Sequence, residues 1–274
     1  MFDAFYALLF GAVQGITEFF PISSSAHLLF LHRVIPLSFA NELAFDVALH
    51  VGTLGALLLV FWKDIARYSI AFFRWATKRS IGADADLRMA WWLLLGTVPA
   101  VVVGVVAGNV IESVLRSTLL AAVVLVGVGL LFFPAEKLAT KARSLEHLTW
   151  KDALVIGCAQ ALALVPGVSR SGITLLAGFG RGMTREAAAR FSFLLAIPVV
   201  FVAGIKEGYT LLQTGVVHED IAALVVGLVS SLVVGFIVIR YFLRFVRTHT
   251  LLPFAWYRIV AGVFVLGIIA MQLF

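Results

Sequence analysis

Six long apolar runs constrain the fold of this chain more than any other feature. Each has about the length of helix that crosses the ~30 Å hydrocarbon core of a bilayer. With 62% hydrophobic and only 13% charged residues, and a mean hydropathy of +1.04, the chain carries more apolar surface than a soluble core could bury. The sequence therefore predicts an all-α polytopic membrane protein. The runs lie near 43–62, 90–108, 118–135, 191–205, 221–239 and 254–273.

Two further apolar stretches, 3–34 and 153–180, are broken midway by turns rich in Pro, Gly and Ser. Their arms of about 10–15 residues are too short to cross the bilayer alone. A broken helix at membrane depth persists only where protein or water satisfies the freed backbone groups. Each stretch therefore predicts a re-entrant helical hairpin that enters, turns and leaves on the same side.

Basic residues indicate how these segments are oriented. They gather in the connections 63–88, 136–151 and 240–249, whereas 109–117 and 206–220 carry few of them. The positive-inside rule places the first three connections in the cytoplasm. Six crossings and two hairpins then place both termini outside. The excess of 21 Lys and Arg over 15 acids fits loops that face anionic lipid, with no nucleic-acid partner. The N-terminus has no basic region typical of a removable signal peptide.

The two broken stretches resemble each other. "GAVQGITEFFPISSSAHL" from Gly11 and "GCAQALALVPGVSRSGITL" from Gly157 align with one single-residue gap. Both read Gly-x-x-Gln, an apolar stretch, Pro and a serine cluster. Each is followed by three crossings, which divides one membrane domain, 1–274, into halves 1–137 and 138–274. Because one hairpin and three crossings make an odd number of passages, the second half is predicted to be inverted. Inverted repeats bring discontinuous helices together around one midplane site; the alternative is chance similarity between two breaks.

Polar residues of the first break have a helical arrangement. Gln14 and Glu18 are four residues apart and share one face of the entering helix. Pro21 ends that helix, and a serine of the cluster caps the returning one, which places His27 in its first turn. The cluster consists of Ser23, Ser24 and Ser25.

The second break adds a cation. We expect a turn at Pro166–Gly167, a cap from Ser169 or Ser171, and Arg170 projecting from the turn ahead of Thr174. Two helix N-termini that face each other form an anion site, and phosphate is the usual occupant. Arg170 offers a fork of donors that matches phosphate oxygens. Ionisable groups within a membrane are functional candidates by default, although a structural Glu–Arg pair, or serines bonded to their own backbone, would leave the same pattern.

The motifs "QGITEFFPISSSAH" and "PGVSRSGIT" resemble the signatures of the bacterial undecaprenyl-pyrophosphate phosphatase family, known for bacitracin resistance. "FDVALHVGTLGALL" and "PFAWYRIVAG" extend the resemblance over nearly the whole chain. The resemblance implies a multi-pass enzyme of the bacterial inner membrane whose site opens to the periplasm. It would remove one phosphate from undecaprenyl diphosphate, regenerating the lipid carrier of peptidoglycan synthesis, with Mg²⁺ or Ca²⁺ as cofactor.

The resemblance also implies roles for individual residues. The catalytic group would be Glu18, Ser24, His27 and Arg170. The substrate-binding group would be Gln14, Ser23, Ser25, Ser169, Ser171, Thr174 and Arg258. Gln14 stands where the family often has a second carboxylate, so the metal would rest on Glu18, substrate phosphates and water. A neutral His27 would deprotonate Ser24 for attack on the terminal phosphorus. Attack by water, or by His27 itself, stays open.

The rival hypothesis is a transporter of a polyprenyl phosphate that uses the same anion site. Asp46 and His50, four residues apart, would then be a proton relay or only a helix-stabilising pair. The single cysteine, Cys158, excludes an internal disulfide. The sequence leaves open whether the protein is a homodimer and which chain length of lipid it prefers.

Overall fold

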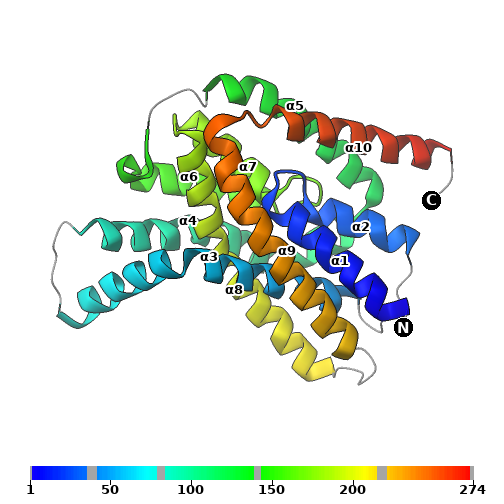
Figure 1. The fold of residues 1–274 in the computed structure, drawn as a ribbon, viewed down its shortest axis with the longest axis horizontal. Coiled ribbons are helices and arrows are strands. Elements are labelled where there is room, and N and C mark those ends of the chain that lie inside the picture. Colours follow the sequence, from blue (N-terminus) through cyan, green and yellow to red (C-terminus); the bar gives the residue numbers. More distant parts are fainter. Residues whose placement is uncertain (1, 36–41, 79–83, 139–142, 215–220, 272–274) are drawn as a thin grey trace.

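A computed structural model describes residues 2–35, 42–78, 84–138, 143–214 and 221–271. The described chain is helical and contains no strand (Figure 1). A π-helical turn, Ile111–Leu115, and a 3₁₀ turn, Leu145–His147, accompany the helices. The α-helices are α1 (Phe2–Phe19), α2 (Ser24–Val34), α3 (Glu42–Lys78), α4 (Ala85–Val110), α5 (Thr118–Leu138), α6 (Trp150–Leu162), α7 (Arg170–Gly180), α8 (Arg185–Thr214), α9 (Ile221–Thr248) and α10 (Leu252–Ala270).

Six of these helices are long and apolar enough to cross a membrane, so the predicted fold class, an all-α polytopic membrane protein, is confirmed. They match the six apolar runs of the sequence one to one. The spans are Phe45–Thr77, Ala85–Gly108, Thr118–Leu138, Arg185–Lys206, Ile221–Thr248 and Leu252–Ala270.

The helices extend further than the apolar runs. Residues that the sequence places in the connections 63–88 and 240–249 continue α3 to Lys78 and α9 to Thr248. Hydropathy detects where a helix leaves the lipid, but Lys and Arg are good helix formers and do not end it. The longer helix α3 changes direction at Phe61, where φ is −102° and ψ is 15°.

The predicted hairpins correspond to two pairs of short helices, α1 with α2 and α6 with α7, packed against each other. Helices α2, α6 and α7 have 11 to 13 residues, which gives them lengths below ~20 Å at 1.5 Å per residue. Helix α1 packs along α9, and α6 packs along α4. In both contacts the first glycine of Gly-x-x-Gln lets the backbones approach, because a Cβ at Gly11 or Gly157 would collide with the carbonyl of Gly227 or Gly96. These equivalent contacts agree with two related halves, and their inversion stays a prediction.

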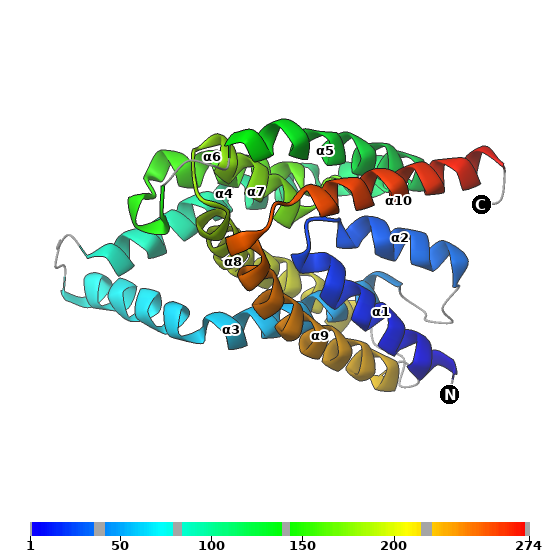
Figure 2. The ribbon, with the colours of Figure 1, turned by 45° about the horizontal axis from the view of Figure 1, so that its top comes forward.

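The two ends of the helical assembly differ in the elements that they carry. Figure 2 shows the start of α1 and the end of α10 at one end, and the end of α3 with the start of α4 at the other. The latter end, called the basic end below, carries Arg74 near the end of α3 and Arg88 near the start of α4. The uneven distribution of basic residues along the sequence therefore corresponds to a difference between the two ends of the fold.

An ionic cluster fixes the start of the second hairpin. Thr149 and Asp152 form a reciprocal capping box at the start of α6. The fully buried Asp152 carboxylate also accepts from Arg143 at 2.7 Å and from Arg181 at 2.6 Å. Burial alone would raise the pKa of this carboxyl, but the hydrogen bonds from Arg143, Thr149 and Arg181 outweigh it and hold the pKa well below its usual range. Asp152 thus joins the segment before α6 to the end of α7.

We expect Asp152→Ala to lower the free energy of unfolding by about 3 kcal/mol, because it leaves two guanidinium groups without their buried partner. A carboxyl whose pKa is lowered on folding stabilises the fold above its unfolded pKa, near 3.9, and this contribution is lost as the pH falls towards the folded pKa. Unfolding in detergent should therefore show a difference between the two proteins that is full at pH 7 and shrinks below about pH 4. Glu146→Ala, at an exposed acid nearby, should change stability little; an equal loss in both variants would contradict the account.

Candidate active site

The turns of the two hairpins meet at one cavity of about 270 Å³. Its polar wall contains residues from both breaks and from α3 and α6: Glu18, Ser24, Ser25, His50, Gln160, Ser169 and Arg170. Its remaining wall is apolar, formed by Val47, Val51, Ala100, Ala163, Leu164, Val199, Val200, Ala203 and Gly204. The first residues of α2 and α7 thus face the same space, which is the arrangement expected of an anion site.

Glu18 lies at the centre of the polar contacts. Its Oε2 accepts hydrogen bonds from Ser24 Oγ at 2.7 Å and from Gln14 Nε2 at 3.2 Å, while its Oε1 accepts from Arg170 at 2.9 Å. His50 Nε2 lies 3.7 Å from Oε2. The carboxylate is 8% exposed, so it is almost enclosed by these groups. The Ser24 hydroxyl, which donates a hydrogen bond to this buried carboxylate, therefore has the arrangement of a nucleophile next to a general base.

Arg170 joins the two hairpins. One terminal nitrogen donates to Glu18 and the other to the Ser192 carbonyl of α8, at 3.1 Å. Within the described part of the chain, its buried Nε has no hydrogen-bond partner. The Arg170 side chain also lines the cavity.

The two serine caps share an unusual backbone conformation. Ser23 has φ 75° and Ser169 has φ 71°, and among the described residues no other non-glycine has a positive φ. Each of these serines directly precedes the first residue of its helix, α2 or α7. Ser169 Oγ accepts from the Gly172 N–H, whereas Ser23 Oγ pairs with Ser25 Oγ at 3.2 Å. Strained backbone of this kind concentrates at functional sites.

Arg258, predicted near the phosphates, is fully buried and binds backbone carbonyls. Its guanidinium donates to Pro21 at 3.0 Å in the first turn and to Gly167 at 2.7 Å in the second. A further bond reaches Leu125 of α5. Arg258 therefore holds the two turns together and does not line the cavity in this structure.

His27 lies apart from the Ser24 hydroxyl. Its Nδ1–H donates to the Ser23 carbonyl, and the Tyr257 hydroxyl lies 2.8 Å from Nε2. The ring stacks on Tyr257 and is not part of the cavity wall. Both ring nitrogens are engaged elsewhere, so the group that contacts Ser24 is Glu18. The predicted His27–Ser24 contact is absent from this structure.

The remaining predicted residues, Ser171 and Thr174, form hydrogen bonds within and between the two hairpins and with α8. Ser171 Oγ donates to the Phe20 carbonyl at 3.1 Å, across the two hairpins. Thr174 Oγ1 bonds the Arg170 carbonyl at 2.7 Å and Ser192 Oγ at 2.6 Å. Both are buried and outside the cavity wall.

Among the polar residues of the cavity wall, the sequence did not predict His50 and Gln160. The sequence suggests His50 only as a partner of Asp46, in a transporter relay or in a helix-stabilising pair. In the structure its Nδ1 bonds the Asp46 carbonyl and its Nε2 faces Glu18. The Asp46 side chain instead bonds His32 and Arg116, so the two side chains form no relay with each other. Gln160, the glutamine of the second Gly-x-x-Gln, is the other missed residue; the repeat itself was the signal that could have found it.

A divalent cation is expected from the resemblance, and the donor set limits how one could be held. The described residues contain no group of three His, Cys, Asp or Glu that could hold a metal. Glu18 is one carboxylate, and the adjacent Gln14 Oε1 is buried with no partner in the described structure. These two oxygens fit a cation that takes its other ligands from phosphates and water, as Mg²⁺ commonly does. They do not fit a site built by protein alone.

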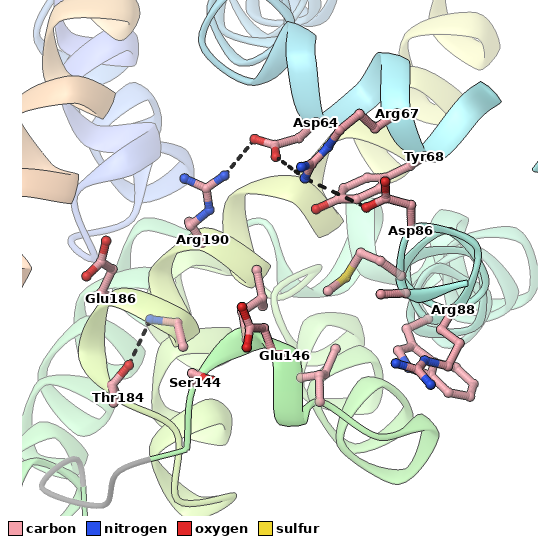
Figure 3. Close-up of a pocket in the computed structure, with 16 residues that line it drawn as sticks. Asp64, Arg67, Tyr68, Asp86, Arg88, Ser144, Glu146, Thr184, Glu186 and Arg190 are labelled. Carbon is pink, nitrogen blue, oxygen red and sulfur yellow. Dashed lines mark hydrogen bonds and ion pairs between the residues drawn. The ribbon is translucent and has the colours of Figure 1, made fainter. Parts of the chain in front are cut away.

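A larger cavity of about 700 Å³ lies at the basic end, between α3, α4, α8 and residues 144–148 (Figure 3). Arg190 on α8 bonds Asp64 on α3 at 2.6 Å, and Arg67 contacts both Asp64 and Asp86. Figure 3 shows these side chains directed at one another along the wall. The cavity contains none of the hairpin-turn residues, so the smaller cavity is the candidate active site.

Fold and site together define a polytopic membrane protein with a polar cavity between the turns of two helical hairpins. The family model described as "Bacitracin resistance protein BacA" matches residues 7–264. An undecaprenyl-diphosphatase of Arthrobacter sp. (strain FB24) is 42% identical over 94% of this chain and 91% of its own length. That of Geotalea daltonii is 42% identical over 95% and 96%, and undecaprenyl-diphosphatase 1 of Pseudoalteromonas translucida is 40% identical over 93% and 95%. The chain belongs to the BacA family.

Proposed function

We propose that this protein hydrolyses undecaprenyl diphosphate to undecaprenyl phosphate and phosphate. By this reaction it would recycle the lipid carrier of peptidoglycan synthesis and confer resistance to bacitracin. Family membership and the names of the relatives support the substrate. The observation that carries the reaction is the Ser24–Glu18–Arg170 arrangement, in which a hydroxyl, a carboxylate and a cation from two hairpins line one cavity.

We assign the first step to Ser24. Its Oγ attacks the terminal phosphorus while Glu18, 2.7 Å away, takes the proton. The bond between the bridging oxygen and the terminal phosphorus breaks, undecaprenyl phosphate leaves, and Ser24 carries the phosphoryl group. Arg170 and the N–H groups at the starts of α2 and α7 stabilise the charge that develops on the phosphoryl oxygens.

Water completes the reaction. Glu18 returns its proton to the leaving lipid phosphate and then accepts one from the attacking water. It passes this proton to the Ser24 oxygen as the phosphorus–oxygen bond breaks, which releases phosphate and restores both the Ser24 hydroxyl and the Glu18 carboxylate. His50, 3.7 Å from Glu18, contributes to holding the carboxylate in position. The apolar wall of the cavity suits the first isoprene units of the lipid.

The cation, Mg²⁺ or Ca²⁺, would arrive with the diphosphate, held by Glu18 and Gln14 Oε1 on the protein side. When bound, it would neutralise part of the charge on the phosphate oxygens.

We expect Gln14→Glu to remain active and to need less Mg²⁺ or Ca²⁺. The substitution places a second hard oxygen ligand on the helix face that carries Glu18. It also replaces the amide that donates to Glu18 by a second charge, which a cation would relieve. Activity against cation concentration, for wild type and variant, gives the two midpoints. Equal midpoints would show that residue 14 does not face the ion.

The fold and the distribution of charges support one orientation in the membrane. We propose that the basic end lies in the cytoplasm of a bacterial inner membrane and that both termini lie on the periplasmic side. Helix α1 begins, and helix α10 ends, at the end opposite the end of α3 and the start of α4 (Figure 2). The site is proposed to open to the periplasm.

Purified protein in detergent tests this function directly. With undecaprenyl diphosphate it should release one phosphate per lipid and leave undecaprenyl monophosphate, without a membrane gradient. A carrier of polyprenyl phosphate would release none in detergent and would need two compartments to show activity. Absence of phosphate release from folded protein supplied with Mg²⁺ or Ca²⁺ would refute the proposal.

A further inference from the structure

A buried amide in the wall of the candidate active site has no hydrogen-bond partner among the described residues. Gln160, near the end of α6, is 2% exposed, and neither its Nε2 nor its Oε1 has a hydrogen-bond partner within the described chain. The side chain lines the cavity together with Glu18, Ser24 and Arg170. Leaving a buried polar group unpaired costs free energy, and buried polar groups are almost always satisfied. An unpaired amide in a cavity wall therefore points to a ligand.

The repeat explains why this amide is free. In the first hairpin Gln14 donates to Glu18, the residue four positions later. In the second hairpin the residue four positions after Gln160 is Leu164, whose side chain accepts no hydrogen bond. Leu164 lines the same cavity. The second hairpin thus keeps the amide of the motif and lacks the acceptor that engages it in the first.

We infer that Gln160 is a substrate-binding residue whose Nε2–H groups donate to oxygen atoms of the lipid diphosphate. The inference rests on the proposed function and assigns the donor set of the same site. Phosphate oxygens are acceptors, and the amide supplies two donors beside the guanidinium of Arg170 and the hydroxyl of Ser169. Because the amide is neutral, it adds directional recognition without a further buried charge.

Under this assignment the two hairpins supply different groups to the reaction. The first supplies the nucleophile and the base, Ser24 and Glu18. The second supplies the donors that hold the diphosphate against them: Gln160, Ser169 and Arg170. The two equivalent glutamines therefore serve different partners, one the carboxylate and the other the substrate.

Gln160→Leu tests the inference, because it removes the amide but keeps a similar size. We expect the KM for undecaprenyl diphosphate to rise about 10-fold or more, as for a lost hydrogen bond to a charged group. The melting temperature without ligand should stay the same or rise, since no partner within the protein is lost. A non-hydrolysable farnesyl methylenediphosphonate should raise the melting temperature of the wild type and raise that of Gln160→Leu much less.

Two further variants serve as controls. Gln160→Glu keeps the size but places a carboxylate beside the phosphates, so its KM should exceed that of Gln160→Leu. Thr118→Val removes another buried polar atom that has no partner in the described structure, outside the cavity wall. It should leave both KM and the stabilisation by the diphosphonate at wild-type values.

A Gln160→Leu protein with wild-type KM and wild-type stabilisation by the diphosphonate would overturn the inference. So would a Gln160→Leu protein that unfolds at a much lower temperature without ligand, because the amide would then have a partner within the protein. A failure of the proposed reaction would give a different experimental result. Wild-type protein that releases no phosphate, but whose stabilisation by the diphosphonate depends on Gln160, would refute the hydrolysis and support this binding role.

Discussion

Ser24→Ala should reduce phosphate release at least about 1,000-fold, with the protein still folded. The hydroxyl is the attacking group in the proposed reaction, and it donates to Glu18 at 2.7 Å. Glu18→Gln should have an effect of similar size, because it removes the acceptor of the proton. Residues that act as one unit are strongly non-additive, so the double variant should be little worse than either. Steady-state phosphate release for the three proteins gives this comparison.

Ser230→Ala is the matched control for Ser24→Ala. Ser230 lies on α9 and donates to the Leu8 carbonyl, outside the cavity wall, so its loss should leave turnover near wild type. Near-normal release by Ser24→Ala, with loss of activity in His27→Ala, would contradict the assignment. It would indicate His27 as the nucleophile or as the base for water, although its ring nitrogens contact Ser23 and Tyr257 in this structure.

Arg170→Lys should lower kcat/KM at least about 10-fold, or about 1.4 kcal/mol, even though the charge is kept. Arg170 spans two partners, Glu18 and the Ser192 carbonyl, and its Nε has no hydrogen-bond partner among the described residues. One ammonium group cannot reproduce a planar fork of donors. Kinetic constants of the purified variants give the size of the loss, and the unfolding temperature shows whether the fold is retained.

Arg190→Lys tests whether any Arg-to-Lys change at an ion pair is harmful. Arg190 bonds Asp64 in the larger cavity at the basic end and does not line the smaller cavity. We expect its kinetic constants to stay near wild type. If Arg170→Lys behaves in the same way, Arg170 serves only as the cation that neutralises Glu18.

The membrane fold could be predicted from the sequence because the lipid imposes a simple rule on composition. Each predicted apolar run corresponds to a helix long enough to span the membrane. The run 118–135, for example, corresponds to the helix Thr118–Leu138. Helix ends were less predictable, since charged residues after Phe61 continue α3 as readily as apolar ones. The breaks were predictable because Pro, Gly and serine clusters interrupt helices locally.

The members of the site were predictable only where they lie at those breaks. Glu18, Ser24, Ser169 and Arg170 line one cavity, as a shared site between two hairpins requires. The contacts of His27 were not predictable, because its spacing from Ser24 does not reveal that the Ser23 carbonyl and Tyr257 bind its ring. Arg258 was expected at the phosphates, but a charge alone does not specify its acceptors, which are turn carbonyls. His50 comes from another helix, and no local pattern places it beside Glu18.

The proposed covalent step can be tested by trapping. Purified protein is mixed with undecaprenyl diphosphate labelled in the terminal phosphate, stopped by rapid acid quench, and digested for peptide mapping. Phosphoserine survives acid, whereas phosphohistidine does not. The account predicts label on Ser24, formed within one turnover and absent from Ser24→Ala. Rapid release of labelled phosphate, with no acid-stable label on Ser24 at any time within the first turnover, would contradict it.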